Sequence, residues 1–166
     1  MLISGCSTIS FNERYKDADW NKIIIAPFEG KMANIAEREF EHALAISNNI
    51  DVVPTSIVML QLREHKLDEL YSVNAMEAII KLAKIMNADG IIVGEVEGYA
   101  PSRISSSDLA ASSASIHAKL LDVKNLNTVV SSQQNESSIF IGVKALMESV
   151  SQKSVEEFQE GLSLIK

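Results

Sequence analysis

The chain has 166 residues, of which 46% are hydrophobic and 22% are charged, a composition typical of one globular domain with a substantial core. Its formal net charge of −7 argues against a nucleic-acid partner, because the phosphates would be repelled. The single cysteine excludes an internal disulfide and a cysteine-rich zinc site. No apolar run reaches the roughly 18 residues that a bilayer-spanning helix needs.

The single cysteine, Cys6, follows Ile3, Ser4 and Gly5. This run resembles the lipobox of bacterial lipoproteins, in which an aliphatic residue and small residues precede a cysteine that receives lipid. The resemblance implies covalent lipid on Cys6, palmitate included, and no other cofactor. Residues 1–5 are then the remnant of a signal peptide, and we expect its basic and apolar regions upstream of the numbered chain. The alternative is a small buried cysteine in a disordered cytosolic tail.

A lipidated N-terminus and tether are predicted for residues 6–21, which are mostly polar and lack a clear period. Trp20 is the aromatic residue that stands out in this segment. A tryptophan beside a membrane can lie at the lipid interface or pack in the groove of a partner protein. The alternative interpretation is that Trp20 covers the edge of the first strand of the domain.

A single α/β domain is predicted for residues 22–166, and it opens with a strand, a helix and a second strand. The continuous apolar run from Lys22 to Phe28 is typical of a strand buried on both faces. Apolar residues recur at helical spacing from Met32 to Leu44, which predicts a helix. The second short strand is expected from Ile50 to Val53, where Pro54 ends it.

Two helices are predicted between residues 55 and 86. Thr55 or Ser56 is a suitable N-cap for the first of them. Asn74 is a suitable N-cap for the second, and Glu77 lies at the third position, as in a capping box.

The strand predicted for residues 90–99 begins fully apolar and ends in alternation. Gly90, at its start, is expected to take the left-handed conformation that closes the preceding helix. Later in the strand, Glu95 and Glu97 alternate with a valine, so both carboxylates face the same side. They form a candidate oligomer surface, and the alternative is acid–base work by paired carboxylates.

The C-terminal part begins with a serine-rich segment, residues 102–113, which is expected to be a long mobile loop. Strands are then predicted for Ser115–Val123 and Thr128–Ser137, joined in an antiparallel hairpin by a short turn. A helix is predicted from about Val143 to Ile165. Together these elements predict an α/β fold with a mixed sheet of about five strands and with the helices packed against it.

Three stretches resemble a superfamily of bacterial periplasmic lipoproteins: residues 23–29 (IIIAPFE), 83–99 (AKIMNADGIIVGEVEGY) and 115–135 (SIHAKLLDVKNLNTVVSSQQN). They are similar to the opening strand, the helix–turn–strand and the hairpin of CsgG, PelC, LpoB and the TolB amino-terminal domain. The resemblance implies an anticodon-binding-domain-like fold and no catalysis, with PelC and LpoB nearest in size. A CsgG-like pore is not expected, because residues 102–113 are too short and too polar for transmembrane hairpins.

No catalytic or metal-binding motif was found in the sequence. His42, His65 and His117 lie on separate predicted elements without the spacing of metal ligands. Neither a phosphate-binding loop nor a serine nucleophile elbow occurs.

The sequence is compatible with three functions. The first is a non-enzymatic lipoprotein on the periplasmic face of the outer membrane, an accessory or scaffold subunit of an envelope export or assembly system. Its partners are the membrane, through the lipid anchor, an envelope protein and further copies of itself, arranged as a homo-oligomeric ring. The second is a monomeric activator of a cell-wall synthase, although the tether reaches only about 20–24 Å as a flexible chain. The third is a small cytosolic α/β hydrolase or nucleotide-binding domain.

Overall fold

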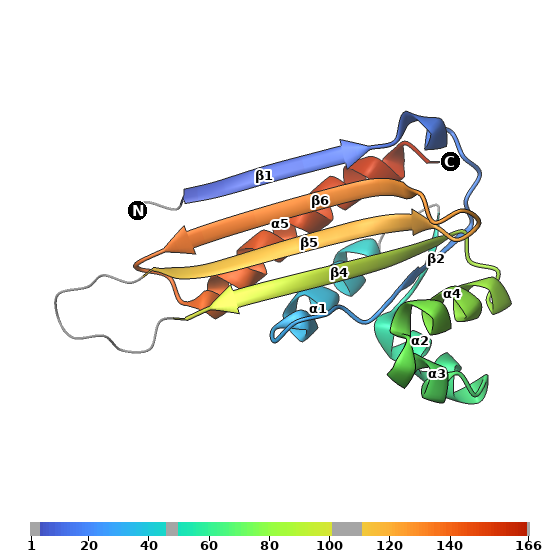
Figure 1. The fold of residues 1–166 in the computed structure, drawn as a ribbon. Helices are drawn as coiled ribbons and strands as arrows, with labels where there is room; N and C mark the ends of the chain where they lie inside the picture. Colours follow the sequence, from blue (N-terminus) through green and yellow to red (C-terminus); the bar gives the residue numbers. More distant parts are fainter. Residues whose placement is uncertain (1–3, 46–49, 101–110, 166) are drawn as a thin grey trace.

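Six strands form one open, mixed sheet in the order β1-β6-β5-β4-β2-β3 (Figure 1). The computed structural model describes residues 4–45, 50–100 and 111–165. The strands are β1 (Ser4–Phe11), β2 (Lys22–Ile25), β3 (Asp51–Val53), β4 (Gly90–Tyr99), β5 (Ser112–Asp122) and β6 (Thr128–Ser138). The helices are α1 (Ala33–Leu44), α2 (Thr55–Glu64), α3 (Asp68–Val73), α4 (Ala75–Ile85) and α5 (Val143–Ser163), with a 3₁₀ turn, η1, at Glu13–Tyr15. The predicted fold class is therefore confirmed.

Strand β2 is buried on both faces, as its unbroken apolar run predicts. It pairs in parallel with β3 and β4, and Ile23, Ile24 and Ile25 are all fully buried. Because successive side chains of a strand point to opposite faces, Ile24 enters the core formed with α2 and α4, whereas its two neighbours enter the core formed with α1 and α5. Strand β2 thus joins the two hydrophobic cores.

Strands β4, β5 and β6 form a long antiparallel meander, to which β1 adds at the edge. In β5 the predicted alternation is confirmed: Ile116, Ala118 and Leu120 are buried, and the residues between them are half-buried. The turn to β6 is held by Asp122, whose carboxylate accepts a hydrogen bond from the Lys124 N–H at 2.8 Å.

The helices cover the two faces of the sheet unequally (Figure 1). Helices α1 and α5 lie on one face, and the 21-residue α5 crosses β4, β5 and β6. Helices α2, α3 and α4 lie on the other face, where α2 and α4 pack against β2, β3 and the start of β4. Within the described residues, no helix covers this second face over β5, β6 and β1.

Three features of the chain differ from the expected secondary structure. Residues 4–11, all of which were expected to belong to a signal remnant and an irregular tether, form β1 and pair with β6 along the whole strand. The apolar pattern that predicts a strand is weak here, because an edge strand with one open face needs few apolar side chains. A short additional helix, α3, lies between the two predicted helices. Ser112 and Ser113 open β5, whereas residues 102–110 of the expected loop lie outside the described residues.

The capping of α4 is confirmed, whereas that of α2 is different from the prediction. The Asn74 side chain accepts a hydrogen bond from the Glu77 N–H at 3.2 Å. The N-cap of α2 is Pro54, which has no side chain able to cap, and the Thr55 N–H instead donates to the Glu41 carboxylate at 2.8 Å. A carboxylate of α1 therefore replaces the local cap, a substitution that depends on tertiary packing.

The left-handed residue that closes α4 is Asn87, with φ 53°, and the expectation for Gly90 is wrong. The Ala88 N–H donates to the Ala83 carbonyl at 2.9 Å, as in a Schellman motif. Gly90 opens β4 instead, where a β-carbon would lie 2.6 Å from the ring of Trp20. The glycine is needed there for close packing rather than for the turn.

A substitution at Phe40 tests whether this side chain belongs to the core formed with α1 and α5, which is the larger of the two cores. Its ring packs edge-to-face against Phe28 and Phe158, with centroids 5.1 and 5.2 Å away, and it is fully buried. We expect Phe40→Ala to lower the free energy of unfolding by about 3–5 kcal/mol, measured by urea denaturation. The matched control is Phe140→Ala: its side chain is 73% exposed, so the change should stay within about 0.5 kcal/mol. Equal losses in the two variants would contradict the assignment.

Candidate functional surface: the open face and the outer edge of the sheet

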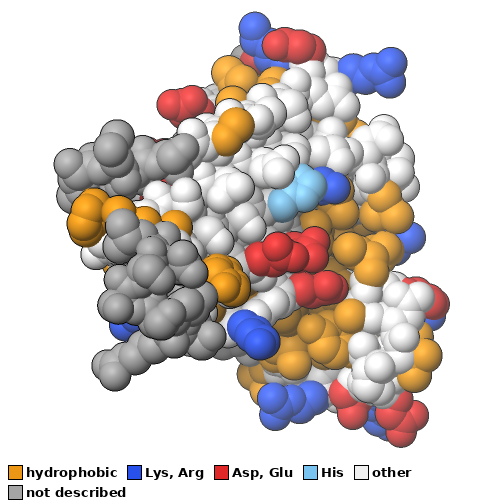
Figure 2. Space-filling model, turned by 60° about the vertical axis from the view of Figure 1, so that its left-hand side comes forward, with side chains coloured by type: hydrophobic (Ala, Val, Ile, Leu, Met, Phe, Trp, Pro, Cys, Tyr) orange, Lys and Arg blue, Asp and Glu red, His pale blue; other side chains and the backbone are white. Residues whose placement is uncertain are grey.

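The open face is the side of β1, β6, β5 and the second half of β4 that points away from α5. Directly opposed residues of antiparallel strands lie on the same face, so the strand register defines its rows. One row consists of Thr8, Gln133, His117 and Glu95, and the next consists of Cys6, Asn135, Ser115 and Glu97. Figure 2 shows a broad area of uncharged polar side chains and backbone, with a histidine close to a group of acidic side chains. The charge is thus concentrated near β4.

The predicted pair Glu95 and Glu97 lies on the open face, and both residues are exposed. Glu95 opposes His117 on β5, and it forms an isolated bridge with Glu29, which follows β2. A shallow cleft of about 170 Å³ next to them is lined by Glu29, Glu95, His117 and Lys119, with apolar contributions from Met76, Val93 and Gly94. The charged groups of the cleft are therefore the carboxylates of Glu29 and Glu95 and the ammonium group of Lys119.

Negative charge continues from this cleft towards α1. Burial raises the pKa of Glu37, whereas the Phe28 N–H that donates to its carboxylate at 2.8 Å lowers it and the neighbouring Glu41 raises it again. Burial also raises the pKa of the Tyr71 hydroxyl, and the carboxylates of Glu37 and Glu29 add to that effect. Burial thus disfavours the charged form of both groups, and the neighbouring carboxylates add a smaller effect in the same direction.

Cys6 lies in the same row of the open face as Glu97. Its thiol is free and the residue is exposed. Three strand spacings separate the two residues, which corresponds to about 14 Å. Of the other lipobox residues, Ser4 and Gly5 belong to β1 and Ile3 lies outside the described residues. The structure thus brings the predicted lipidation residue and the predicted acidic pair to one surface.

Trp20 does not lie on a surface that could contact a membrane or a partner. It is 8% exposed, and its ring packs over Gly90 and edge-to-face with Tyr15 at a centroid distance of 5.9 Å. The prediction of a contact residue is therefore corrected, and Trp20 is buried against the sheet, as in the alternative, but over Gly90 of β4. Burial of its large apolar ring stabilises the start of the domain.

The histidines do not form a site together. His42 lies on α1, His65 follows α2 and His117 lies on β5. Among the described residues, no three histidine, cysteine, aspartate or glutamate side chains are placed so that they could hold a metal ion. Within the same ranges, no helix combines the length and the apolar character needed to cross a membrane.

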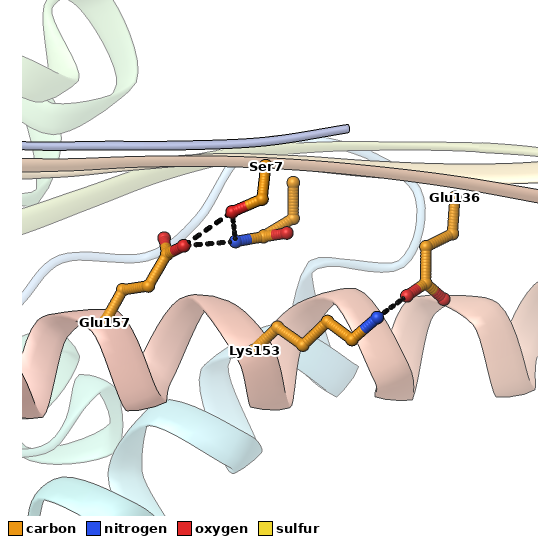
Figure 3. Close-up of polar contacts among 5 residues, drawn as sticks. Ser7, Glu136, Lys153 and Glu157 are labelled. Carbon is orange, nitrogen blue, oxygen red and sulfur yellow. Dashed lines mark hydrogen bonds and ion pairs between the residues drawn. The ribbon is translucent and has the colours of Figure 1, made fainter. Parts of the chain in front are cut away.

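A polar seam lies on the opposite face of the sheet, between β6, β1 and α5 (Figure 3). Its centre is Glu157 of α5, whose carboxylate accepts hydrogen bonds from the Ser7 and Ser132 hydroxyls at 2.7 and 2.5 Å. A third hydrogen bond comes from the Gln134 amide at 2.7 Å. Glu157 therefore holds α5 to β6 and to the edge strand at once.

Glu136 is the second acidic group of the seam and is 1% exposed. One of its carboxylate oxygens forms an ion pair with Lys153, and the other oxygen has no hydrogen-bond partner (Figure 3). A pocket of about 530 Å³ opens beside it between β1 and α5, and Glu156 and Glu160 line its helical wall. Sequence reasoning missed this region. The available signal was that residues 131–138 (SSQQNESS) are polar at every position, so both faces of the strand had to be polar.

A substitution at Glu157 tests how much the polar seam contributes to the stability of the domain. We expect Glu157→Ala to lower the free energy of unfolding by about 1–3 kcal/mol, because the buried Ser132 hydroxyl loses its acceptor and the buried Gln134 amide keeps only its bond to Ser7. Chemical denaturation measures this loss. Glu156→Ala, which removes the exposed carboxylate of the adjacent residue, should change the stability by less than about 0.5 kcal/mol. A neutral Glu157→Ala would show that the seam contributes nothing to stability.

No protein-family model and no curated protein matches the chain, but solved structures do. A PelC dodecamer from Paraburkholderia phytofirmans is 15% identical, with a TM-score of 0.57 over 94% of this chain and 98% of that one. Lipoprotein GNA1162 from Neisseria meningitidis is 17% identical, with a TM-score of 0.52 over 84% and 99%. Hypothetical protein CT253 from Chlamydia trachomatis is 9% identical, with a TM-score of 0.52 over 86% and 98%. The chain therefore has the fold of PelC and of lipoprotein GNA1162 over most of its length.

Proposed function

We propose that this protein is a lipoprotein of the outer membrane that faces the periplasm and acts without catalysis. Its role is that of an accessory or scaffold subunit of an envelope export or assembly system. The observation that carries the proposal is the position of Cys6, which lies near the end of the sheet where exposed apolar side chains gather.

That end of the sheet suits contact with a bilayer. The first residues of β1 pair with the last residues of β6, and Ile139 and Phe140 follow β6 directly. Their side chains are 44% and 73% exposed, and Tyr99, at the same end of β4, is 57% exposed. Aromatic and apolar side chains stabilise proteins at the membrane interface. Acyl chains on Cys6 would hold this end of the domain towards the lipid.

Protein binding is better supported than catalysis. The carboxylates of the open face are exposed, so they lack the desolvation that normally tunes catalytic acids and bases. The fold is shared with lipoprotein GNA1162 and with PelC. A monomeric activator of a cell-wall synthase is less well supported, because β1 takes much of the expected tether into the sheet.

A homo-oligomer, arranged as a ring, is the form of assembly that we propose. A solved PelC structure with this fold is a dodecamer, which supports the idea that the domain shape permits closed assemblies. In the proposed oligomer, Glu95 and Glu97 lie at the subunit contact or line the lumen, because they are the charged pair that the open face presents.

Lipid anchoring is tested by Cys6→Ser. In cells that export and lipidate the protein, we expect it to move from the membrane fraction to the soluble fraction, because one lipid-bearing residue supplies the anchor. Fractionation and immunoblotting measure the distribution. The control is Ser10→Cys in the Cys6→Ser background, which returns a thiol to β1 outside the lipobox and should stay soluble. A Cys6→Ser variant that stays in the membrane fraction would contradict lipid on Cys6 as the anchor. A protein that is already soluble before the substitution would also contradict the anchor and would favour a cytosolic α/β domain.

The oligomer is tested by light scattering after size exclusion, with Cys6→Ser as the soluble background. We expect a discrete mass several times that of one chain, and a smaller mass for Glu97→Arg if this residue lies at the subunit contact. Glu69→Arg, which makes the same charge change on the exposed surface of α3, should leave the mass unchanged. A strict monomer at every concentration would contradict the oligomer and favour a monomeric activator or adaptor.

A further inference from the structure

We propose that the outer edge of β1 binds an extended, basic segment of a partner protein as a seventh strand of the sheet. This edge would be the docking surface for the protein partner, and in that respect the proposal rests on the proposed function.

Strand β1 is the outermost strand of the sheet, and among the described residues no strand pairs with its outer side. It pairs with β6 on its other side without a bulge from Ser4 to Phe11. Edge strands commonly carry charges, proline or bulges that prevent pairing with foreign strands. Strand β1 (SGCSTISF) has no charged residue and no proline, so its free backbone groups are available to a further strand. Cleavage before Cys6 would leave most of this edge in place.

The pocket beside the edge selects for positive charge. It is lined by Gly5, Cys6 and Ser7 of β1 and by Glu136, Lys153, Glu156, Glu157 and Glu160, with Gln134 and Asn135. Four carboxylates therefore face one ammonium group, and that ammonium is already paired with Glu136. Glu156 and Glu160 are exposed on successive turns of α5, and neither forms an ion pair within the described part of the chain.

The buried carboxylate of Glu136 also points to a ligand in this pocket. It is 1% exposed, and one of its carboxylate oxygens has no hydrogen-bond partner. The opposing residue on β1 is Gly5, which has no side chain to place over it and which cleavage before Cys6 would remove, so no β1 side chain covers Glu136 from this position before or after cleavage. A buried acceptor without a partner costs free energy, and a lysine or arginine entering the pocket would supply the donor once the side chains that cover this oxygen move aside.

Charge complementarity favours a basic partner over a second copy of this chain. Two copies joined through β1 would bring the acidic flanks of their α5 helices next to each other, and like charges oppose that contact. In an added strand every second side chain points towards α5. The occupant is therefore an extended segment with lysine or arginine at alternate positions and small or β-branched residues between them.

Binding is tested with the full chain and three capped eight-residue peptides. The first alternates lysine and threonine, the second replaces each lysine with glutamate, and the third is the lysine peptide N-methylated at alternate residues. We expect the lysine peptide to bind at least tenfold more tightly than either of the others by calorimetry, and to slow amide exchange in β1 by NMR. Equal affinity of the N-methylated peptide would overturn strand addition, because only charge attraction would remain.

A pair of double variants tests the pocket. Glu156→Gln with Glu160→Gln should weaken binding of the lysine peptide about fivefold, as expected for two exposed charge pairs. Glu64→Gln with Glu69→Gln removes the same charge from exposed positions on α2 and α3 and should leave the affinity unchanged. Equal weakening in both would overturn the pocket assignment. Failure of all peptide binding would refute this inference while leaving lipid anchoring, tested separately through Cys6, unaffected.

Discussion

The unequal helical cover of the two sheet faces is the constraint on which the rest of the structure depends. Strands β4, β5 and β6 are ten or eleven residues long, and on one face the long helix α5 packs against all three of them. The helices on the other face pack against β2, β3 and the start of β4. Side chains beyond that cover meet water, and they are accordingly serine, threonine, asparagine and glutamine with a few charges. The open face is a direct consequence of helix length and placement.

The polar seam shows where the larger core ends. The inner face of β6 changes from Val130 to Ser132, Gln134 and Glu136, all of them buried. Buried polar groups destabilise a protein unless hydrogen bonds compensate their desolvation, and Glu157 supplies acceptors for two of these side chains. The same carboxylate binds Ser7. Strand β1 is therefore held by backbone pairing and polar contacts rather than by a large apolar area, and its outer edge stays hydrophilic.

Three surfaces follow from this arrangement, and they point in different directions. The end of the sheet near Cys6 carries exposed apolar side chains suited to a membrane. The open face carries the acidic pair of β4, which suits contacts between subunits or with cargo. The outer edge of β1 adjoins an acidic pocket on α5. In the proposed function, an anchor attached directly to the sheet would hold the other surfaces at a defined orientation to the bilayer, as a scaffold requires.

The sequence by itself determined the elements whose signals are local: the apolar run of β2, the capping box of Asn74 and Glu77, the alternation of β5 and the apolar stripe of α5. Each depends on residues within a few positions of one another, where backbone geometry alone decides the outcome. Only the tertiary structure decided that β1 joins the sheet, that Trp20 is buried over Gly90, and that Cys6 shares a row with Glu97. The seam around Glu157 also belongs to this group. These features arise from contacts between residues far apart in the sequence, and no local pattern encodes which distant strand completes a sheet.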